Sequence, residues 1–138
     1  MKTAMAVLLG LTAVLCAQTA ASVRDGVYTN DQASRGAAAY KQKCASCHGP
    51  ALEGVGQNPP LSGDDFKANW SGKTLGDLFD EIQATMPADH PGILSQPVNA
   101  QIIAFILKSN EFPAGKKELP ADSGALQKIG FDAAKPKQ

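Results

Sequence analysis

The segment Cys44-Ala45-Ser46-Cys47-His48 constrains this chain more than any other part of its sequence. Two thiols three positions apart, followed directly by an imidazole, suit three kinds of chemistry. These are a redox-active dithiol, part of a zinc site, or the covalent attachment of a haem group. Each kind of site needs different partners elsewhere in the chain, so the remaining residues can be used to choose among them.

The N-terminal residues have the layout of a secretory signal peptide. Lys2 gives a positive start, residues 4–16 form an apolar run, and small residues follow up to Ser22. The apolar run is too short to cross a bilayer well. We therefore expect a signal peptide over residues 1–21, cleavage near Ala21, and export to the periplasm. A membrane anchor or a lipid-modified Cys16 are the weaker alternatives.

Cleavage would leave Cys44 and Cys47 as the only cysteines of the mature chain, since the third, Cys16, leaves with the signal peptide. Small exported domains commonly depend on disulfides, so here a cofactor is favoured as the stabilising element. The chain has 13 basic and 13 acidic residues, which gives no electrostatic footprint for nucleic acid. No second long apolar run follows, so we expect no membrane insertion after cleavage.

The zinc and dithiol interpretations lack the partners they need. A structural zinc site takes four ligands from Cys and His, and beyond the motif the mature chain offers only His90. A redox dithiol usually opens a helix that follows a strand. Residues 31–43 instead indicate a helix, with Asp31 as its N-cap, that ends at the motif. Both interpretations stay open, but the sequence favours haem.

The motif C-x-x-C-H suits a c-type haem for a physical reason. Thiols at this spacing can meet the two vinyl groups of one porphyrin edge and form thioethers, and the next residue then presents its imidazole to the iron. Cys44 and Cys47 are therefore the predicted attachment residues, and His48 is the predicted first iron ligand.

The second axial ligand follows by elimination. Met86 is the one methionine left after cleavage, and Pro87 ends the preceding helical pattern and stiffens the backbone beside it. We predict that Met86 is the second iron ligand, with core packing as the alternative for this residue. His90 is expected to be a solvent-facing loop residue. Two strong axial ligands leave no open coordination site, which favours electron transfer over catalysis.

Four further residues are expected at the haem. The stretch 50–63 is rich in Pro and Gly and predicts a loop; in it, the carbonyl of Pro59 is placed to accept a hydrogen bond from His48, and Leu61 to pack on the ring. Residues 74–84 predict an amphipathic helix whose apolar side, Phe79 included, faces the haem. Trp70 has an N–H that suits a haem propionate, although plain core packing is equally compatible.

These residues together resemble the class I c-type cytochromes. The resemblance covers about residues 30–110 and rests on the motif, the Pro59-Pro60-Leu61 loop, Met86-Pro87, and helices over residues 31–43 and 97–110. It implies an all-α cytochrome c fold: three main helices and loops around one haem, with the first and last helices crossing near Gly36 and Tyr40. Residues 22–138 would form one cytochrome c domain, with a C-terminal tail from about residue 113.

Finer features resemble bacterial cytochromes that operate beside PQQ-dependent or other periplasmic dehydrogenases. They are the stretch 70–79, Thr85-Met86-Pro87 and Pro91-Gly92. The resemblance implies a soluble carrier, not an enzyme, that moves electrons from such a dehydrogenase to an oxidase or another cytochrome in transient complexes. The alternatives are a permanent cytochrome subunit of a dehydrogenase complex, and a haem-based sensor or enzyme with a labile sixth ligand.

Overall fold

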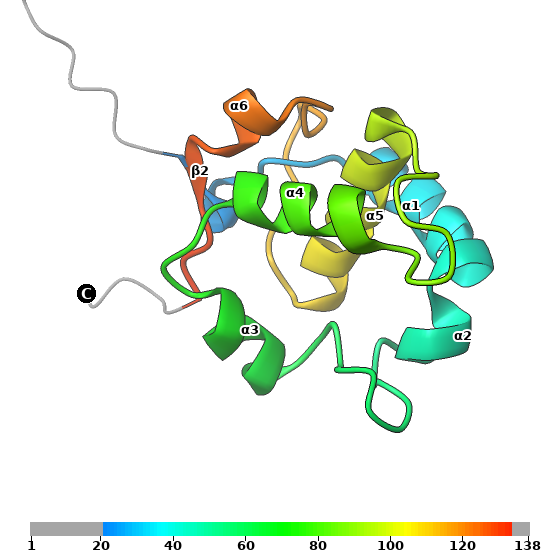
Figure 1. The fold of residues 1–138 in the computed structure, drawn as a ribbon. Helices are drawn as coiled ribbons and strands as arrows, with labels where there is room; N and C mark the ends of the chain where they lie inside the picture. The colour runs from blue at the N-terminus through cyan, green and yellow to red at the C-terminus, as the bar shows by residue number, and fades with distance from the viewer. Residues whose placement is uncertain (1–20, 134–138) are drawn as a thin grey trace, which may run out of the picture.

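The computed structural model describes residues 21–133, so the expected signal peptide, apart from Ala21, lies outside the described part. The described chain is mostly helical (Figure 1), as the all-α prediction requires. Its elements, in chain order, are β1 (Ala21–Ser22), the 3-10 helix η1 (Val23–Asp25), α1 (Asn30–Lys43), α2 (Ala45–His48), α3 (Asp64–Trp70), α4 (Leu75–Thr85), α5 (Gln96–Ser109), α6 (Ser123–Leu126) and β2 (Ile129–Gly130). Within residues 21–133, no helix has the length and apolar character needed to cross a membrane.

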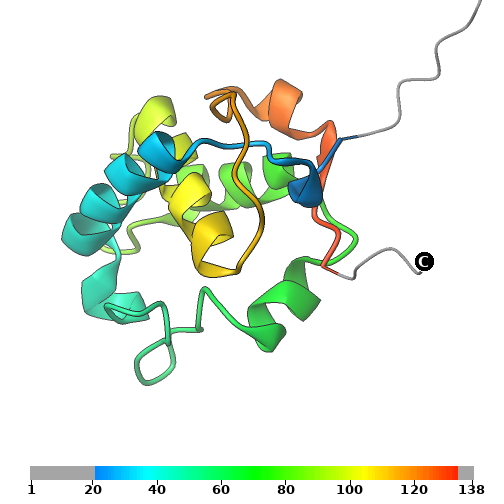
Figure 2. The same cartoon turned by 180° about the vertical axis from the view of Figure 1, so that it is seen from behind.

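Helices α1 and α5 form the central crossing of the fold (Figure 2). A Cβ atom added to Gly36 would overlap the backbone carbonyl of Gln101, so only a residue without a side chain allows this approach. One turn further on, the ring of Tyr40 lies 5.2 Å from the ring of Phe105. The expected crossing near Gly36 and Tyr40 is therefore confirmed.

The starts of the two crossing helices differ slightly from the sequence prediction. Helix α1 begins at Asn30, and the hydroxyl of Thr29 accepts a hydrogen bond from the Gln32 N–H, so Thr29 and not Asp31 is the N-cap. Asp31 lies in the first turn, where its charge still favours the positive end of the helix. Helix α5 begins one residue before Pro97, which the first turn tolerates because its missing N–H would have no partner there.

Helix α4, which the amphipathic pattern over residues 74–84 predicted, begins with a capping box at Thr74. The Thr74 hydroxyl accepts from the Asp77 N–H at 3.1 Å, and the Asp77 carboxylate accepts from the Thr74 N–H at 2.8 Å. Two backbone donors that have no partner within the helix are thereby satisfied. This backbone hydrogen bond is the main reason why the pKa of Asp77 is lowered, and side-chain hydrogen bonds from Gln127 and Thr74 lower it further. The apolar residues Leu75, Leu78, Phe79 and Ile82 are buried, as the amphipathic pattern predicts.

The short helices η1, α2, α3 and α6 were not predicted, and α3 and α6 show why. Helix α3 buries a single large apolar residue, Phe66, so its seven residues carry no apolar stripe that periodicity could detect. Helix α6 is one turn long and begins at the Asp122 side chain, which accepts from the Ala125 N–H. Both are held mainly by tertiary packing: Phe66 contacts Phe131 at 5.9 Å between ring centroids, and Leu126 is fully buried.

The C-terminal tail packs on the body of the protein, where it meets the N-terminal segment. Strands β1 and β2 pair in parallel, with Ala21 opposite Ile129. The backbones of Gly26 and Gly115 touch so closely that a side chain on Gly115 would not fit. Figure 2 shows these two segments crossing each other beside α5. The tail and the N-terminal segment thus form a clasp, defined here as residues 21–28 and 112–133.

Candidate functional site

A cavity of about 530 Å³ lies among α2, the loop that follows it, α3, α4, the loop after α4, and α5. This volume falls within the roughly 300–1,000 Å³ typical of small-molecule and cofactor sites. Its wall includes seven of the eight residues predicted for the haem site: Cys44, Cys47, His48, Pro59, Leu61, Trp70 and Met86. The chain therefore brings together, in one hollow, residues that are more than forty positions apart in sequence.

The motif folds as a single helical turn that presents its three reactive side chains to this cavity. Cys44 ends α1, with its N–H donating to the Tyr40 carbonyl at 2.8 Å. The Cys44 carbonyl then accepts from the N–H groups of Cys47 at 3.1 Å and His48 at 2.9 Å. Cys44 is half-buried, Cys47 is exposed and His48 is only 7% exposed. One thiol thus lies inside the cavity wall and the other at its edge.

The imidazole of His48 is held by one hydrogen bond. Its Nδ1 lies 2.8 Å from the carbonyl oxygen of Pro59, which confirms this predicted contact. Because a carbonyl can only accept, Nδ1 carries the proton and Nε2 keeps its lone pair. Within residues 21–133, Nε2 has no hydrogen-bond partner, and His48 is part of the cavity wall. The ring is therefore set up to ligate a metal through Nε2.

The electrostatics of the motif do not suit a nucleophilic dithiol. Burial, together with the neighbouring Cys47, raises the pKa of the Cys44 thiol to about 11. Reactive dithiols depend on a lowered thiol pKa, so that the thiolate is present at neutral pH. The zinc alternative gains no support either, since among the described residues no three Cys, His, Asp or Glu side chains are grouped to hold a metal ion.

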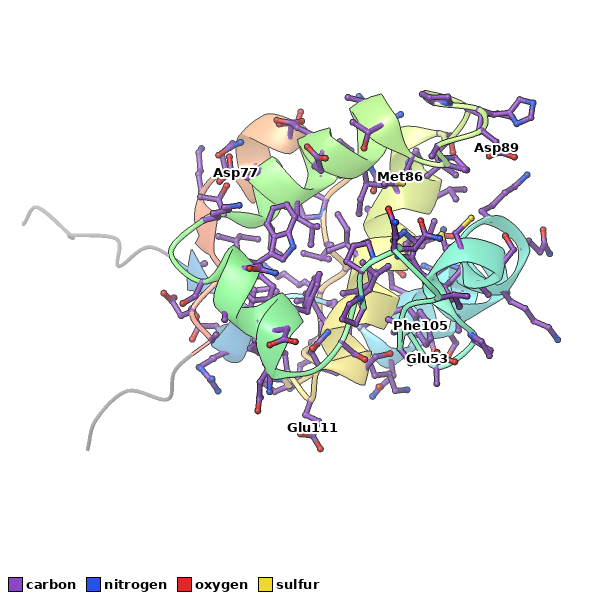
Figure 3. The ribbon with its side chains drawn as sticks, turned by 60° about the horizontal axis from the view of Figure 1, so that its bottom comes forward. Glu53, Asp77, Met86, Asp89, Phe105 and Glu111 are labelled. Atoms are coloured by element: carbon purple, nitrogen blue, oxygen red, sulfur yellow. The ribbon has the colours of Figure 1, made fainter. Side chains whose placement is uncertain are left out.

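Met86 lies at the point where α4 stops (Figure 3). Its N–H still donates to the Ile82 carbonyl at 2.9 Å, but its own backbone is extended, as a residue before proline prefers. The side chain is half-buried and forms part of the cavity wall. A thioether and an imidazole with a free lone pair therefore face the same space, and the assignment of Met86 as an iron ligand stays a prediction.

Of the other residues expected at the haem, Leu61 and Trp70 lie on the cavity wall and Phe79 does not. Successive helical residues are rotated by about 100°, so Phe79 points to a different side of α4 from its neighbour Leu78. Leu78 and Ile82 provide the apolar wall that was assigned to Phe79, whose side chain is buried in the core. The expectation for Phe79 is corrected accordingly.

Trp70 is half-buried at the end of α3, and the ammonium group of Lys73 lies 4.6 Å from the centre of its ring. Its N–H has no hydrogen-bond partner within residues 21–133, which leaves this donor available to a ligand. The structure thus agrees with a polar role for Trp70 at the cavity without testing it.

Several wall residues were not foreseen. They are Phe66 of α3, Ile102 and Ile106 of α5, and Ile93 in the loop after Met86. The α5 residues were recognisable as a core stripe, but nothing in the sequence distinguishes packing on a cofactor from packing on another helix. Ile93 is 57% exposed and stands at the rim. His90 is also at the rim, largely exposed as expected, with Nδ1 3.3 Å from the Asp89 carboxylate.

The donor set fits a c-type haem. Two thiols could form the thioethers, His48 offers a free imidazole nitrogen, and Met86 offers a thioether sulfur, and all four residues line one cavity of suitable size. The remaining wall is largely contributed by apolar side chains such as Leu61, Leu78 and Ile102, which would exclude water from the faces of a flat apolar ring.

Comparison with known proteins gives one family and one related structure. A family model described as "cytochrome c oxidase, cbb3-type, subunit III" matches residues 31–106, which include the motif and Met86. A chain in the crystal structure of the sulfane dehydrogenase SoxCD from Paracoccus pantotrophus has a similar fold, with a TM-score of 0.51 and 23% sequence identity. The match covers 77% of this chain but only 60% of that chain. No curated protein matches the sequence.

Proposed function

Because the chain belongs to the family described as cytochrome c oxidase, cbb3-type, subunit III, we propose that it carries single electrons through one His/Met-ligated haem c. The family and the fold make this protein a c-type cytochrome with the all-α cytochrome c fold. A cytochrome c domain implies covalently bound haem and indicates electron transfer in preference to catalysis.

The observation that carries the proposal is the composition of the cavity wall. Cys44 and Cys47 would attach the haem, and His48 and Met86 would ligate the iron. All four residues line the same cavity. The haem would supply one-electron redox chemistry between ferrous and ferric iron. The protein's own part would be to fix the His48 tautomer through Pro59, to exclude water with apolar side chains, and to offer His48 and Met86 as the two protein ligands of the iron.

The exposure of the motif indicates where electrons would pass. Cys47 is exposed while Cys44 and His48 are partly or wholly buried, so the attachment side of the cavity is the side that faces solvent. The neighbouring rim residue Ile93 adds exposed apolar surface. A small, partly apolar patch suits the weak and short-lived contacts of electron-transfer proteins.

For location and partners we propose a periplasmic carrier between a dehydrogenase and an oxidase or a second cytochrome. The N-terminal sequence features of a signal peptide support export. A permanent subunit of a larger complex is the alternative, which the word "subunit" in the family description favours. Isolation from its native source under mild conditions would separate the two, because a free carrier that has lost its signal peptide would elute below the 14.4 kDa of the full chain, whereas a complex would elute well above it.

The first experiment on the chemistry is an absorption spectrum of the protein matured by a host that attaches haem c. Sharp bands in the reduced protein, together with the weak long-wavelength sulfur-to-iron band in the ferric protein, would support the His/Met carrier. Reduced bands without the sulfur band would favour a sensor or enzyme with an open sixth position, and carbon monoxide would then bind to the ferrous protein. Absence of haem would contradict the proposal.

A further inference from the structure

Two side-chain amides, the half-buried Gln83 and the buried Asn99, join α4 and α5 to the far end of the loop that begins at Met86. The Gln83 amide nitrogen donates to the Leu94 carbonyl at 2.7 Å. The Asn99 amide nitrogen donates to the Gln83 side-chain oxygen at 3.1 Å and to the Phe79 carbonyl at 2.9 Å. Gln83 lies in the last turn of α4, three residues before Met86, so the series of bonds spans the base of the loop.

The direction of each hydrogen bond is fixed by its backbone partner. Phe79 and Leu94 contribute carbonyl oxygens, which can only accept, so both amide groups must point their nitrogen atoms toward them. Gln83 then has its oxygen left to accept from Asn99. A side chain of the same shape without a donor, such as glutamate, would not replace Gln83.

Asn99 places an unpaired polar atom in the core, which lowers the stability of the fold and which packing alone does not explain. Its side chain is 0% exposed, and its Oδ1 has no hydrogen-bond partner within residues 21–133. A buried acceptor without a partner destabilises a fold, whereas an apolar side chain of similar size would avoid that penalty. An asparagine at this position is explained if its two N–H donors are needed to hold α4 against α5 and to orient the Gln83 side chain.

Within residues 21–133, the loop from residue 87 to residue 94 makes no other hydrogen bond to the body of the protein, although its last residue, Leu94, is buried in the core. Its backbone hydrogen bonds within the described chain are internal, from the His90 N–H to Pro87 and from the Ile93 N–H to His90. Asp89, His90 and Ile93 are exposed (Asp89 is labelled in Figure 3). The bond from Gln83 to Leu94 is therefore the hydrogen bond in residues 21–133 that ties this loop to a helix.

We propose that Gln83 and Asn99 are positioning residues that keep the Met86 loop closed on the cavity, and thereby keep the Met86 sulfur available to the iron. This inference rests on the proposed His/Met ligation. Helix α4 fixes the start of the loop, Gln83 fixes its end, and Asn99 fixes Gln83. Opening the loop would require the Gln83–Leu94 hydrogen bond to break.

The test compares holoprotein variants in two readouts. Gln83→Glu keeps the shape but loses the donor to Leu94 at neutral pH, and Asn99→Leu removes both donors while also removing the unpaired oxygen. Thr74→Ala is the control, because it weakens α4 at its other end, far from the loop in sequence. The readouts are hydrogen exchange of peptides covering residues 86–94 and the rate of carbon monoxide uptake by the ferrous protein.

We expect both Gln83→Glu and Asn99→Leu to raise loop exchange and carbon monoxide uptake by about tenfold, the effect of losing one buried hydrogen bond. Thr74→Ala should leave both readouts within about twofold of wild type, even if it lowers the melting temperature as much as Gln83→Glu and Asn99→Leu do. Loop exchange in the two variants equal to that of the control would overturn the proposal. If wild type lacks the sulfur-to-iron band, His/Met ligation fails, and loop exchange alone then decides whether the two amides hold the loop.

Discussion

The Nδ1 atom of His48 and the carbonyl oxygen of Pro59 lie 2.8 Å apart, which couples the predicted iron ligand to the backbone of a loop eleven residues away. The loop is itself tied down: the Gly54 N–H donates to the His48 carbonyl at 2.7 Å, and the Leu61 N–H donates to the Leu52 carbonyl at 2.9 Å. The orientation of the imidazole thus depends on the loop, and each of the loop's contacts is open to substitution.

A methyl group at Gly54 should disturb this coupling. Gly54 has φ +78°, and an added Cβ would lie 2.6 Å from the Asn58 carbonyl oxygen and 2.8 Å from the Pro60 nitrogen. We expect Gly54→Ala to displace Pro59, weaken its bond to His48 and raise the midpoint potential, because a less basic imidazole stabilises ferric iron less. A tenfold change in the stability of the ferric protein relative to the ferrous protein would shift the midpoint potential by about 59 mV in a redox titration.

Gly56→Ala is the matched control for that experiment. Gly56 has φ +61° in the same loop, but an added Cβ there would meet nothing within 4 Å. Both substitutions carry a left-handed backbone penalty of about 1–2 kcal/mol, so Gly56→Ala reproduces that part of the effect without the clash against Asn58 and Pro60. Equal potentials for the two variants would argue against control of the imidazole by Pro59.

Removing the thioether should open the sixth position. We expect Met86→Ala to lose the sulfur-to-iron band and to bind carbon monoxide in the ferrous state, and Met86→His to lower the midpoint potential, since sulfur stabilises ferrous iron more than a second imidazole does. Ile93 lies at the rim of the same cavity and has no ligating atom, so Ile93→Ala should leave the sulfur-to-iron band, carbon monoxide binding and the midpoint potential unchanged. Retention of the sulfur band in Met86→Ala would exclude this residue as the ligand.

The helix crossing should tolerate no side chain at Gly36. An added Cβ would overlap the Gln101 carbonyl and touch the Phe105 Cβ at 3.0 Å, so α1 and α5 would have to separate. We expect Gly36→Ala to lower the free energy of unfolding by about 1–3 kcal/mol, as overpacking typically does. Gly124→Ala in α6, where the nearest atom would be 3.4 Å away, should stay near wild type in the same urea titration.

The capping box of α4 should give stability a dependence on acidic pH. The backbone N–H of Thr74 and two further hydrogen bonds lower the folded-state pKa of Asp77 below its unfolded value. Its contribution is therefore present above the unfolded pKa and lost as pH falls through the folded pKa. We expect wild type to exceed Asp77→Asn in urea midpoint at about pH 7, and the gap to shrink toward about pH 3. A gap that is constant with pH would contradict this assignment.

Local sequence signals predicted much of this fold. The amphipathic pattern over residues 74–84 predicted helix α4, Gly36 marked the helix crossing, and the loop over residues 50–63 brought Pro59 to His48. In each case the relevant contact lies within a short segment or follows from the steric demand of one residue. Such signals depend little on the rest of the chain.

Other features depend on tertiary packing and were missed or misplaced. Phe79 and Leu78 are adjacent and equally apolar, so the sequence could not show which of them faces the cavity. Helix α3 has one buried apolar residue and no pattern. The link from Asn99 to Gln83 joins two helices through polar side chains, which in sequence look like ordinary surface positions.

The clasp also determines on which side of this domain a linker, a membrane anchor or a second domain could be attached. Ala21 pairs beside Ile129, and the Arg24 side chain binds the backbone carbonyls of Asp132 and Ala133. Both ends of the described chain therefore emerge at one side of the molecule, while α2 with its exposed thiol lies at the other (Figure 1). A linker, an anchor or a fused domain at either end would therefore be attached on the side opposite α2. The exposed Cys47 edge, where we propose that electrons pass, would stay accessible to a partner protein.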